Sequence, residues 1–382
     1  MSALLPKELI RGFIALMLVA FPGVGTATLV CGQTISVTTT LAEDLVCPSN
    51  VSPALSIVGA DITLNLGGHT LKGVAVQTNP TAGILVQGAE RVTITNGAIE
   101  GFDEGIALFN ATQVAIRNLT FRNLEIADPD HYLIGVHVHD SHDVLVENSK
   151  FRFLPVIHRD AVIQYFSSTT IRNNDMDVGM VGVSFHPVCD TASAPNNSQI
   201  LNNKFSNTPL AIWVACTNNT RISGNTFVDC HNPIQGDAPF AGAVTGLKIE
   251  DNVITTTVGP SLGIQFRGVR NSTVENNTVK GNDAWGITIG RSLGCIDPVN
   301  NPAWDCFYST NNLIRCNIAL ENGIDLYHDV GSTPNAWENN TRQTQQGGDI
   351  PPCDGHERCL AEQSDFPWEI FMPAILHGAK KK

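Results

Sequence analysis

The sequence predicts an all-β solenoid, in which one short coil of strands and turns is stacked on the next. A hydrophobic residue followed two or three positions later by asparagine recurs at intervals of 22 to 40 residues from Ile94 to Ile314. A repeat of this length, without a helical period, is typical of one coil of a stacked fold. Charged residues are only 15% of the 382-residue chain, and its abundant Gly, Asn, Thr, Ile and Val suit short strands and tight turns.

The asparagines of the repeat fall into two columns when the copies are superposed. Asparagine in a tight turn tolerates a left-handed backbone and bonds its own chain locally. Stacked amides can also donate to the next coil, so we expect a ladder that satisfies buried polar groups. Cys316 takes an asparagine position, where we expect a free buried thiol. One column is Asn174, Asn203, Asn225, Asn252, Asn277 and Asn317, and the other, one residue earlier, is Asn96, Asn118, Asn148, Asn173, Asn202 and Asn276.

A second apolar strand precedes most copies by ten residues, and apolar pairs such as Thr120-Phe121 mark a third strand. Three parallel strands per coil make a β-helix. In the second strand, alternation places the first and third residues inside and the second and fourth outside. The coil that contains Gln235 and Asp237 is irregular and is not placed. The strands expected to align begin at Ile84, Ile106, Val136, Ala161, Val183, Ile212, Ile264, Ile287 and Ile324.

The repeats resemble those of the right-handed parallel β-helix proteins of the pectin-lyase-like superfamily over roughly residues 55–345. The segment Ile62-Thr-Leu-Asn-Leu-Gly-Gly-His-Thr-Leu-Lys-Gly73 looks like the usual first coil of that family. The resemblance implies a single-stranded right-handed parallel β-helix of about ten coils with end caps. The family includes polysaccharide lyases, glycoside hydrolases, sugar epimerases and proteins without known catalysis, so the resemblance does not choose an activity.

The chain is expected to have four parts. Residues 1–27 read as a secretory signal peptide, with Lys7 and Arg11 before an apolar core and small residues up to Ala27. The apolar run is too short to span a bilayer, so we expect a secreted or periplasmic protein with no stable membrane span after signal removal. Since an open β-helix end exposes a sheet edge, the remaining parts are an N-terminal cap (28–55), the parallel β-helix (56–345) and a C-terminal cap or tail (346–382).

Ten cysteines agree with an oxidising compartment. Close spacing favours local disulfides, although sequence alone does not fix the pairing of the other cysteines. The repeat also contains acceptor sites for N-linked sugars, of which Asn196, Asn218 and Asn339 are the better candidates in a eukaryote. The local disulfide candidates are Cys31/Cys47, Cys295/Cys306 and Cys353/Cys359.

Charge and motifs limit the classes of ligand and partner that the chain is expected to bind. The net charge of −13, with no basic stripe to offset it, argues against a nucleic-acid binder. His137-X-His139, with Asp140 and His142 nearby, has a spacing that could hold a metal, but histidines on the surface of such a sheet are more often simply polar. We therefore predict no metal site and no cofactor.

The middle of the outward face gathers polar side chains around a tryptophan. Hydrogen-bonding groups beside a flat apolar ring are what a sugar-binding groove needs, although Trp213 could equally cover a neighbouring coil. The sequence thus predicts a polysaccharide partner. The expected substrate-binding residues are His137, Gln164, Trp213 and Gln265.

The same face offers groups for acid–base chemistry. Lyases and epimerases that act on uronic acids need a base, a proton donor and a cation that neutralises the carboxylate. A hydrolase would need paired carboxylates, for which Asp140, Asp143 and Asp160 are available, but the polygalacturonase motifs are absent. The candidates are His139 or His186 as base, Arg159 or Arg267 as cation, and Tyr132 or Tyr165 as acid.

The leading hypothesis is a secreted carbohydrate-active β-helix protein that binds an extended polysaccharide along the face from His137 to Arg267. If it is an enzyme, a polysaccharide lyase or uronate epimerase is favoured over a polygalacturonase-type hydrolase. The alternative is a non-catalytic extracellular or periplasmic protein with a binding or structural role. A catalytic site should bring base, acid and cation to one point.

Overall fold

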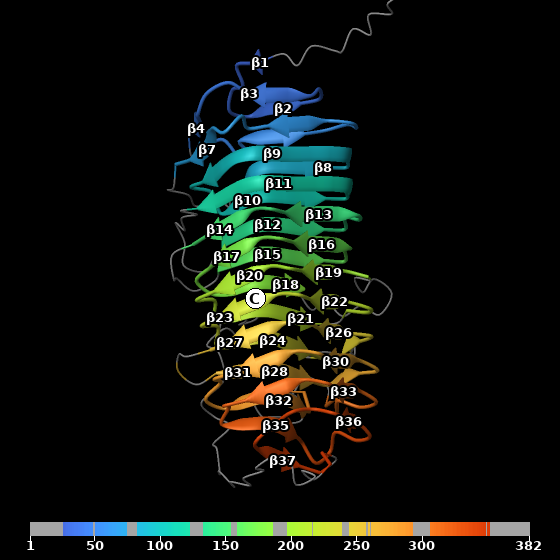
Figure 1. Cartoon of the computed structure of the whole chain (residues 1–382). Helices are drawn as coiled ribbons and strands as arrows, with labels where there is room; N and C mark the ends of the chain where they lie inside the picture. The colour runs from blue at the N-terminus through green and yellow to red at the C-terminus, as the bar shows by residue number, and fades with distance from the viewer. Residues whose placement is uncertain are drawn as a thin grey trace, which may run out of the picture.

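The strands stack as a column from β1 (Thr26–Ala27) at one end to β37 (Gln345–Gly347) at the other (Figure 1). The structure, a computed structural model, describes residues 26–48, 50–74, 82–122, 133–153, 159–185, 197–215, 217–238, 244–256, 259, 261–292, 306–348 and 350–351. In these ranges the chain contains strands and turns and no helix. The predicted all-β parallel solenoid is therefore confirmed.

One wall of the column is a 13-stranded parallel sheet, to which each coil contributes one strand. Its strands are β2 (Gln33–Ile35), β5 (Leu55–Ile57), β8 (Ala82–Gln87), β10 (Glu104–Phe109), β12 (Leu133–His139), β15 (Arg159–Tyr165), β18 (Val181–Phe185), β21 (Leu210–Ala215), β24 (Asn232–Asp237), β28 (Leu262–Arg267), β32 (Trp285–Gly290), β35 (Ile324–His328) and β37 (Gln345–Gly347).

The other two walls form a 22-stranded sheet, because β9 (Glu90–Glu100) and β11 (Thr112–Arg122) run through both. One of these walls also contains β1 (Thr26–Ala27), β3 (Thr39–Leu41), β6 (Thr63–Asn65), β13 (Val144–Glu147), β16 (Thr169–Arg172), β19 (Gln199–Leu201), β22 (Arg221–Ser223), β26 (Lys248–Glu250), β30 (Thr273–Glu275), β33 (Leu313–Arg315) and β36 (Ala336–Glu338). The other contains β4 (Leu45–Cys47), β7 (Thr70–Gly73), β14 (Lys150–Arg152), β17 (Asp175–Asp177), β20 (Lys204–Ser206), β23 (Thr226–Val228), β27 (Val253–Thr255), β31 (Thr278–Lys280) and β34 (Ile318–Leu320). A small separate sheet pairs β25 (Val244–Thr245) with β29 (Val269–Arg270).

The interior is one continuous hydrophobic core. Isoleucines and valines of all three walls point inward, and phenylalanine rings stack from coil to coil. Phe121 lies over Phe151 with 4.7 Å between ring centroids, and Phe205 lies over Phe227 at 5.0 Å. Each of these stacked pairs adds a favourable aromatic contact between two adjacent coils.

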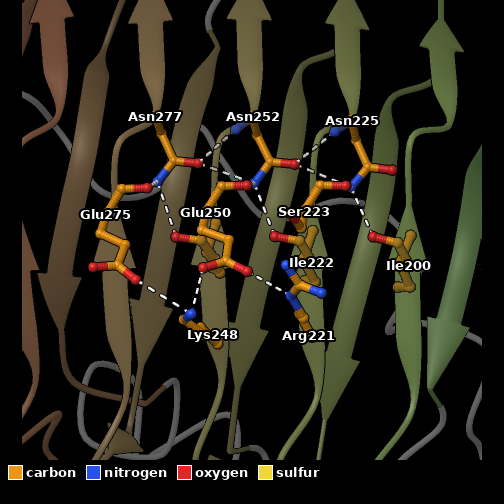
Figure 2. Close-up of polar contacts among 11 residues, drawn as sticks. Ile200, Arg221, Ile222, Ser223, Asn225, Lys248, Glu250, Asn252, Glu275 and Asn277 are labelled. Atoms are coloured by element: carbon orange, nitrogen blue, oxygen red, sulfur yellow. Dashed lines mark hydrogen bonds and ion pairs between the residues drawn. The ribbon is translucent and has the colours of Figure 1, made fainter.

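The predicted asparagine ladder is confirmed (Figure 2). The Asn225 side-chain amide donates to Asn252 Oδ1 at 3.0 Å, and Asn252 donates to Asn277 Oδ1 at 2.9 Å. The same amide group of Asn225 also donates to the Ile200 carbonyl at 2.9 Å. Buried turn groups, which would otherwise lack partners, are satisfied in this way.

The outer column has the predicted left-handed backbone, with φ of 54° at Asn202 and 57° at Asn276. Cys316 shares this conformation, with φ of 54°, and is a free cysteine. Its predicted burial is wrong. The thiol is exposed because the outer column faces solvent, whereas the inner column, one residue later, is buried.

The N-terminal end carries a disulfide between Cys31 and Cys47, as predicted. Cys306 is also disulfide-bonded, while Cys295, Cys353 and Cys359 lie outside the described residues. Thr26–Ala27, at the predicted signal cleavage site, forms β1 and pairs with Thr40–Leu41 of β3. Within the described ranges, no helix is long and apolar enough to cross a bilayer.

Candidate functional site

The outward face of the 13-stranded sheet holds most of the predicted site residues, and the strand register fixes their order along the column. The coil that the repeat could not place aligns fully, since Gln235 pairs with Gln265 and Asp237 pairs with Arg267. One outward row is Ala107, His137, Ile163, Ser184, Trp213, Gln235, Gln265, Thr288 and Tyr327, and a second contains Phe109, His139, Tyr165, Ala215, Asp237, Arg267 and Gly290.

Gln164 does not belong to this face, and its predicted substrate-binding role is wrong. It pairs with the inward Val138, is fully buried, and donates to the Ser167 carbonyl at 2.8 Å and to Ser198 Oγ at 3.1 Å. Tyr165 takes the outward position instead. The predicted inward–outward alternation of this strand is wrong by one residue, because Val162 and Ile163 point to opposite faces and are both apolar.

Three predicted groups cannot be placed. His186 and Tyr132 lie outside the described residues. Arg159 opens β15, where its backbone pairs with Leu133, but its side chain is also outside the description.

Five rings meet on β10, β12 and β15 and in the turn that follows. Phe109, His139 and Tyr165 occupy the same position on consecutive strands, with centroids 5.7 and 5.6 Å apart and tilts of 36° and 31°. His137 meets the Tyr165 ring edge-on at 5.5 Å, and Phe166 meets His139 edge-on at 5.8 Å. The first three rings form a partly exposed row along the solenoid axis, which we call the aromatic row.

Carboxylates hold both histidines in place. His137 Nδ1 lies 2.9 Å from Glu104 Oε1, and His139 Nδ1 lies 2.8 Å from Asp140 Oδ2. The Nε2 atom of His137 is buried and has no hydrogen-bond partner among the described residues. A carboxylate on Nδ1 favours the tautomer in which Nε2 carries a free lone pair.

The structure does not bring His139 and Arg267 together. They lie on β12 and β28, which are five strand spacings apart in the sheet. At roughly 4.8 Å per spacing, the separation is about 24 Å. A base at His139 and a cation at Arg267 therefore cannot act on one sugar carbon, and this predicted combination is wrong.

A second group of polar side chains, which we call the polar cluster, lies on β24, β28 and β32. It consists of Gln235, Asp237, Gln265, Arg267 and Thr288, and each is at least nine-tenths buried although it points away from the core. Gln235 Nε2 donates to Asp237 Oδ2 at 3.1 Å, and an Arg267 guanidinium nitrogen lies 4.0 Å from the same oxygen. Three buried oxygens have no partner in the described structure, namely Asp237 Oδ1, Gln265 Oε1 and Thr288 Oγ1.

Burial shifts the charged members of the polar cluster toward neutrality. It raises the pKa of Asp237 to about 6, against the opposing attraction of Arg267. Burial likewise lowers the pKa of Arg267, and Asp237 offsets this only in part. Because desolvation exceeds mutual attraction, this ion pair is poorly compensated.

Trp213 packs against an apolar patch outside the main core, formed by Met180, Val181 and Leu210. It is partly buried there, so covering its neighbours is one of its roles.

The three carboxylates considered for a hydrolase are not gathered. Asp160 is buried and pairs in register with Ile134 of β12. Ile134 precedes Asp140 by six residues, so Asp160 and Asp140 lie about 20 Å apart along the strand direction.

Several residues of the site could not be recognised from the repeat pattern in the sequence. Glu104 lies ahead of its strand's apolar repeat, Phe109 is an outward aromatic in a column of mixed residues, and Asp237 belongs to the irregular coil. The signal for the polar cluster is an alignment of two segments, Ile234-Gln235-Gly236-Asp237 and Ile264-Gln265-Phe266-Arg267. This alignment places Gln235 beside Gln265 and Asp237 beside Arg267. Among the described residues, no group of three or more His, Cys, Asp or Glu side chains could hold a metal ion.

Known structures share the fold. A mannuronan C-5 epimerase A-module from Azotobacter vinelandii is 12% identical, with a TM-score of 0.57 over 86% of this chain and 91% of that chain. The catalytic unit of an α-1,3-glucanase from Streptomyces thermodiastaticus is 15% identical, with a TM-score of 0.56 over 84% of this chain and 61% of that one. A surface adhesin of Streptococcus pneumoniae is 14% identical, with a TM-score of 0.50 over 82% and 85%. Identities this low show a shared fold and nothing more.

A search of curated proteins found no significant match to the sequence. A family does match, that of the "Right handed beta helix region", over residues 55–186 and 134–348. The parallel three-strand coils, the asparagine ladder and this match over most of the chain agree, and the protein belongs to the right-handed β-helix family.

Proposed function

We propose that the protein binds an extended polysaccharide along the outward face of its 13-stranded sheet, in an extracellular or periplasmic location. The aromatic row is the observation that carries this proposal. Phe109, His139 and Tyr165 present tilted, partly exposed rings at one position on three consecutive strands. Ring faces of this kind suit the apolar faces of sugars, and polar groups at their edges suit hydroxyls.

The direction of the row supports an extended ligand. Strands lie about 4.8 Å apart, so successive rings follow the solenoid axis and continue toward Trp213 and the polar cluster. The disulfide at Cys31–Cys47 agrees with an oxidising compartment. Two of the structural neighbours are, by name, a mannuronan epimerase and an α-1,3-glucanase, so this fold also serves proteins that act on polysaccharides.

Binding to a panel of soluble polysaccharides, measured by affinity electrophoresis and calorimetry, tests the proposal. Replacing Phe109 and Tyr165 together by alanine should weaken binding at least tenfold, since stacking on each ring is worth about 1 kcal/mol. Val253→Ala, at an exposed apolar position on another wall, should bind like the wild type. Equal binding by the double variant would rule out the aromatic row as the platform.

Catalysis of the lyase or epimerase type is the second candidate. His139 supports it, because Asp140 orients the ring at 2.8 Å, one third of the side chain is exposed, and the ring lies beside Tyr165. Such a histidine is suited to take a proton from a sugar carbon, and a nearby tyrosine is suited to give one. The burial of His137 Nε2 thus favours His139 over His137 as the base.

An enzyme of this type would generate new unsaturated ends or change the stereochemistry at C5 of the uronate. Both products can be followed, by ultraviolet absorbance and by proton NMR. His139→Asn and Asp140→Asn should each abolish product if the protein is such an enzyme, while His142→Asn should not. Absence of product from the wild type on every uronate polymer that it binds would leave the binding function alone.

A further inference from the structure

The wall of the 22-stranded sheet that contains β4 and β34 changes character along its length. From β14 to β20 one outward row is charged, with Lys150, Asp175 and Lys204 on consecutive strands. From β23 to β34 the same row contains only uncharged, β-branched side chains. With two neighbours they form a surface that we call the apolar patch, which consists of Thr226, Val228, Val253, Thr255, Thr278 and Ile318.

The apolar patch is contiguous and open to solvent. Val228, Val253 and Ile318 are 37%, 43% and 40% exposed. Val253 pairs in register with Thr226 on one side and with Thr278 on the other, and β23, β27 and β31 follow one another down the column (Figure 1). Contiguous exposed apolar surface marks an interaction site on a folded protein, so we expect a partner to cover the patch.

The chain leaves the described structure beside one end of the apolar patch. Thr341 forms a bridge with Ile318 and so continues the outward row. The next residue, Arg342, is nine-tenths buried, and its Nη2 donates to the Pro351 carbonyl at 2.6 Å. Residues 352–382 follow and lie outside the described ranges. The chain after Pro351 therefore starts next to the patch.

One segment of this remaining sequence is strongly apolar. It is Phe366-Pro-Trp-Glu-Ile-Phe-Met-Pro-Ala-Ile-Leu376, in which Glu369 is the one charged residue. Residues 352–365, which connect it to Pro351, span up to about 45 Å when extended. The patch from β23 to β34 covers three strand spacings, or about 14 Å. The apolar segment can thus reach every part of the patch.

We propose that the segment Phe366–Leu376 docks on the apolar patch, with its aromatic and aliphatic side chains over Val228, Val253 and Ile318. Docking removes apolar surface of both partners from water, which is the main favourable contribution to such contacts. The patch lies on a different wall from the aromatic row. The docking is therefore independent of the proposed polysaccharide binding.

Charge at the border of the patch agrees with this occupant. Lys204 stands beside Thr226 at one edge, and Lys280 stands beside Thr255 at another. The segment contains Glu369 and follows directly after Asp365. Acidic groups in and next to the segment thus meet lysines at the border of an otherwise uncharged surface.

Photo-cross-linking of the full chain tests the docking. With p-benzoylphenylalanine in place of Val253, irradiation and trypsin digestion should join the peptide Ile249–Arg267 to the peptide Cys359–Lys380. The same residue in place of Val46, which is exposed at the other end of this wall, should give no such product. Absence of the Val253 product would overturn the proposal. A cross-link between two chains, seen as a doubled mass on a denaturing gel, would show that a second copy covers the patch instead.

Chymotrypsin measures how completely the patch holds the segment, because cleavage after its aromatic residues requires the undocked state. Val253→Asp places a charge beneath the apolar side chains, so cleavage within Phe366–Leu376 should become at least about tenfold faster. Val46→Asp should stay within about twofold of the wild type, as surface substitutions usually do. Melting curves establish that both variants are folded. Unchanged cleavage of folded Val253→Asp would overturn the docking.

Discussion

Asp160 shows how a single buried carboxyl can govern stability. It lies on β15 with about 5% of its surface exposed, and burial raises its pKa to about 7. The folded state therefore holds this proton more tightly than the unfolded state, in which the pKa is about 3.9. Stability from this residue is fully present below pH 4 and is lost as pH rises through 7.

Asp160→Asn is accordingly expected to stabilise the protein at pH 8 by up to about 4 kcal/mol, the equivalent of the pKa shift, and to change little at pH 4. Urea unfolding at both pH values measures the effect. Asp143→Asn, at an exposed position, serves as the control and should show no such difference. Destabilisation of Asp160→Asn at pH 8 would mean that the charged form has a stabilising role in the fold.

Individual residues also show where sequence reasoning ends. His137, His139, Trp213, Gln265 and Arg267 all lie in the outward rows, as predicted, because each follows an apolar residue in a regular strand. Gln164 does not, because neighbouring valine and isoleucine fit either face and burial alone decides between them. Distances between coils, such as that between His139 and Arg267, depend on the count of intervening strands, which one irregular coil obscured.

At the scale of the element, the asparagine ladder stabilises the turns by a chain of bonds rather than by separate contacts. Asn252 donates to Asn277 and to the carbonyls of Ile222 and Glu250, and accepts from Asn225. Removing one amide leaves groups on two neighbouring coils without partners. The ladder could be predicted from the sequence because asparagine recurs at the same position in successive coils.

Asn252→Ala should lower the free energy of unfolding by roughly 3 kcal/mol, because buried partners lose their hydrogen bonds. Asn276→Ala, in the exposed outer column, should cost only about 1 kcal/mol for its left-handed backbone. Chemical denaturation of the two variants compares them directly. Equal costs would show that the inner column has no special role.

Beside this ladder runs a row of ion pairs (Figure 2). Glu250 contacts Arg221 and Lys248, and Lys248 also reaches Glu275 at 3.4 Å. Burial raises the pKa of Glu250, but the two cations outweigh it and the net pKa is lowered. A lowered folded pKa means that this stability is present above the unfolded pKa of about 4.3 and is lost as pH falls through the folded value.

Glu250→Gln should therefore destabilise the protein at pH 7 by about 1 kcal/mol or less, since the cations are half exposed and solvent screens them. At pH 3 the variant and the wild type should converge. Thermal melts across this pH range follow the difference, with Glu338→Gln on β36 as an exposed glutamate control. A cost that grew toward acid pH would contradict the ion-pair account.

At the scale of the whole molecule, the solenoid separates functions by distance along one axis. The aromatic row and the polar cluster share one face; at roughly 4.8 Å per strand, their central strands, β12 and β28, lie about 24 Å apart, and their nearest strands, β15 and β24, about 14 Å apart. Neither place unites a base, an acid and a cation among the described residues. A histidine base on β12 and the Arg267 cation on β28 therefore cannot act together on one sugar unit.

The structure of the protein with a bound oligosaccharide tests the central claim most directly. We predict sugar rings over Phe109, His139 and Tyr165, with the sugar chain running parallel to the solenoid axis toward Arg267. An oligosaccharide bound to either of the other two walls, or one lying across the axis and away from these rings, would contradict it.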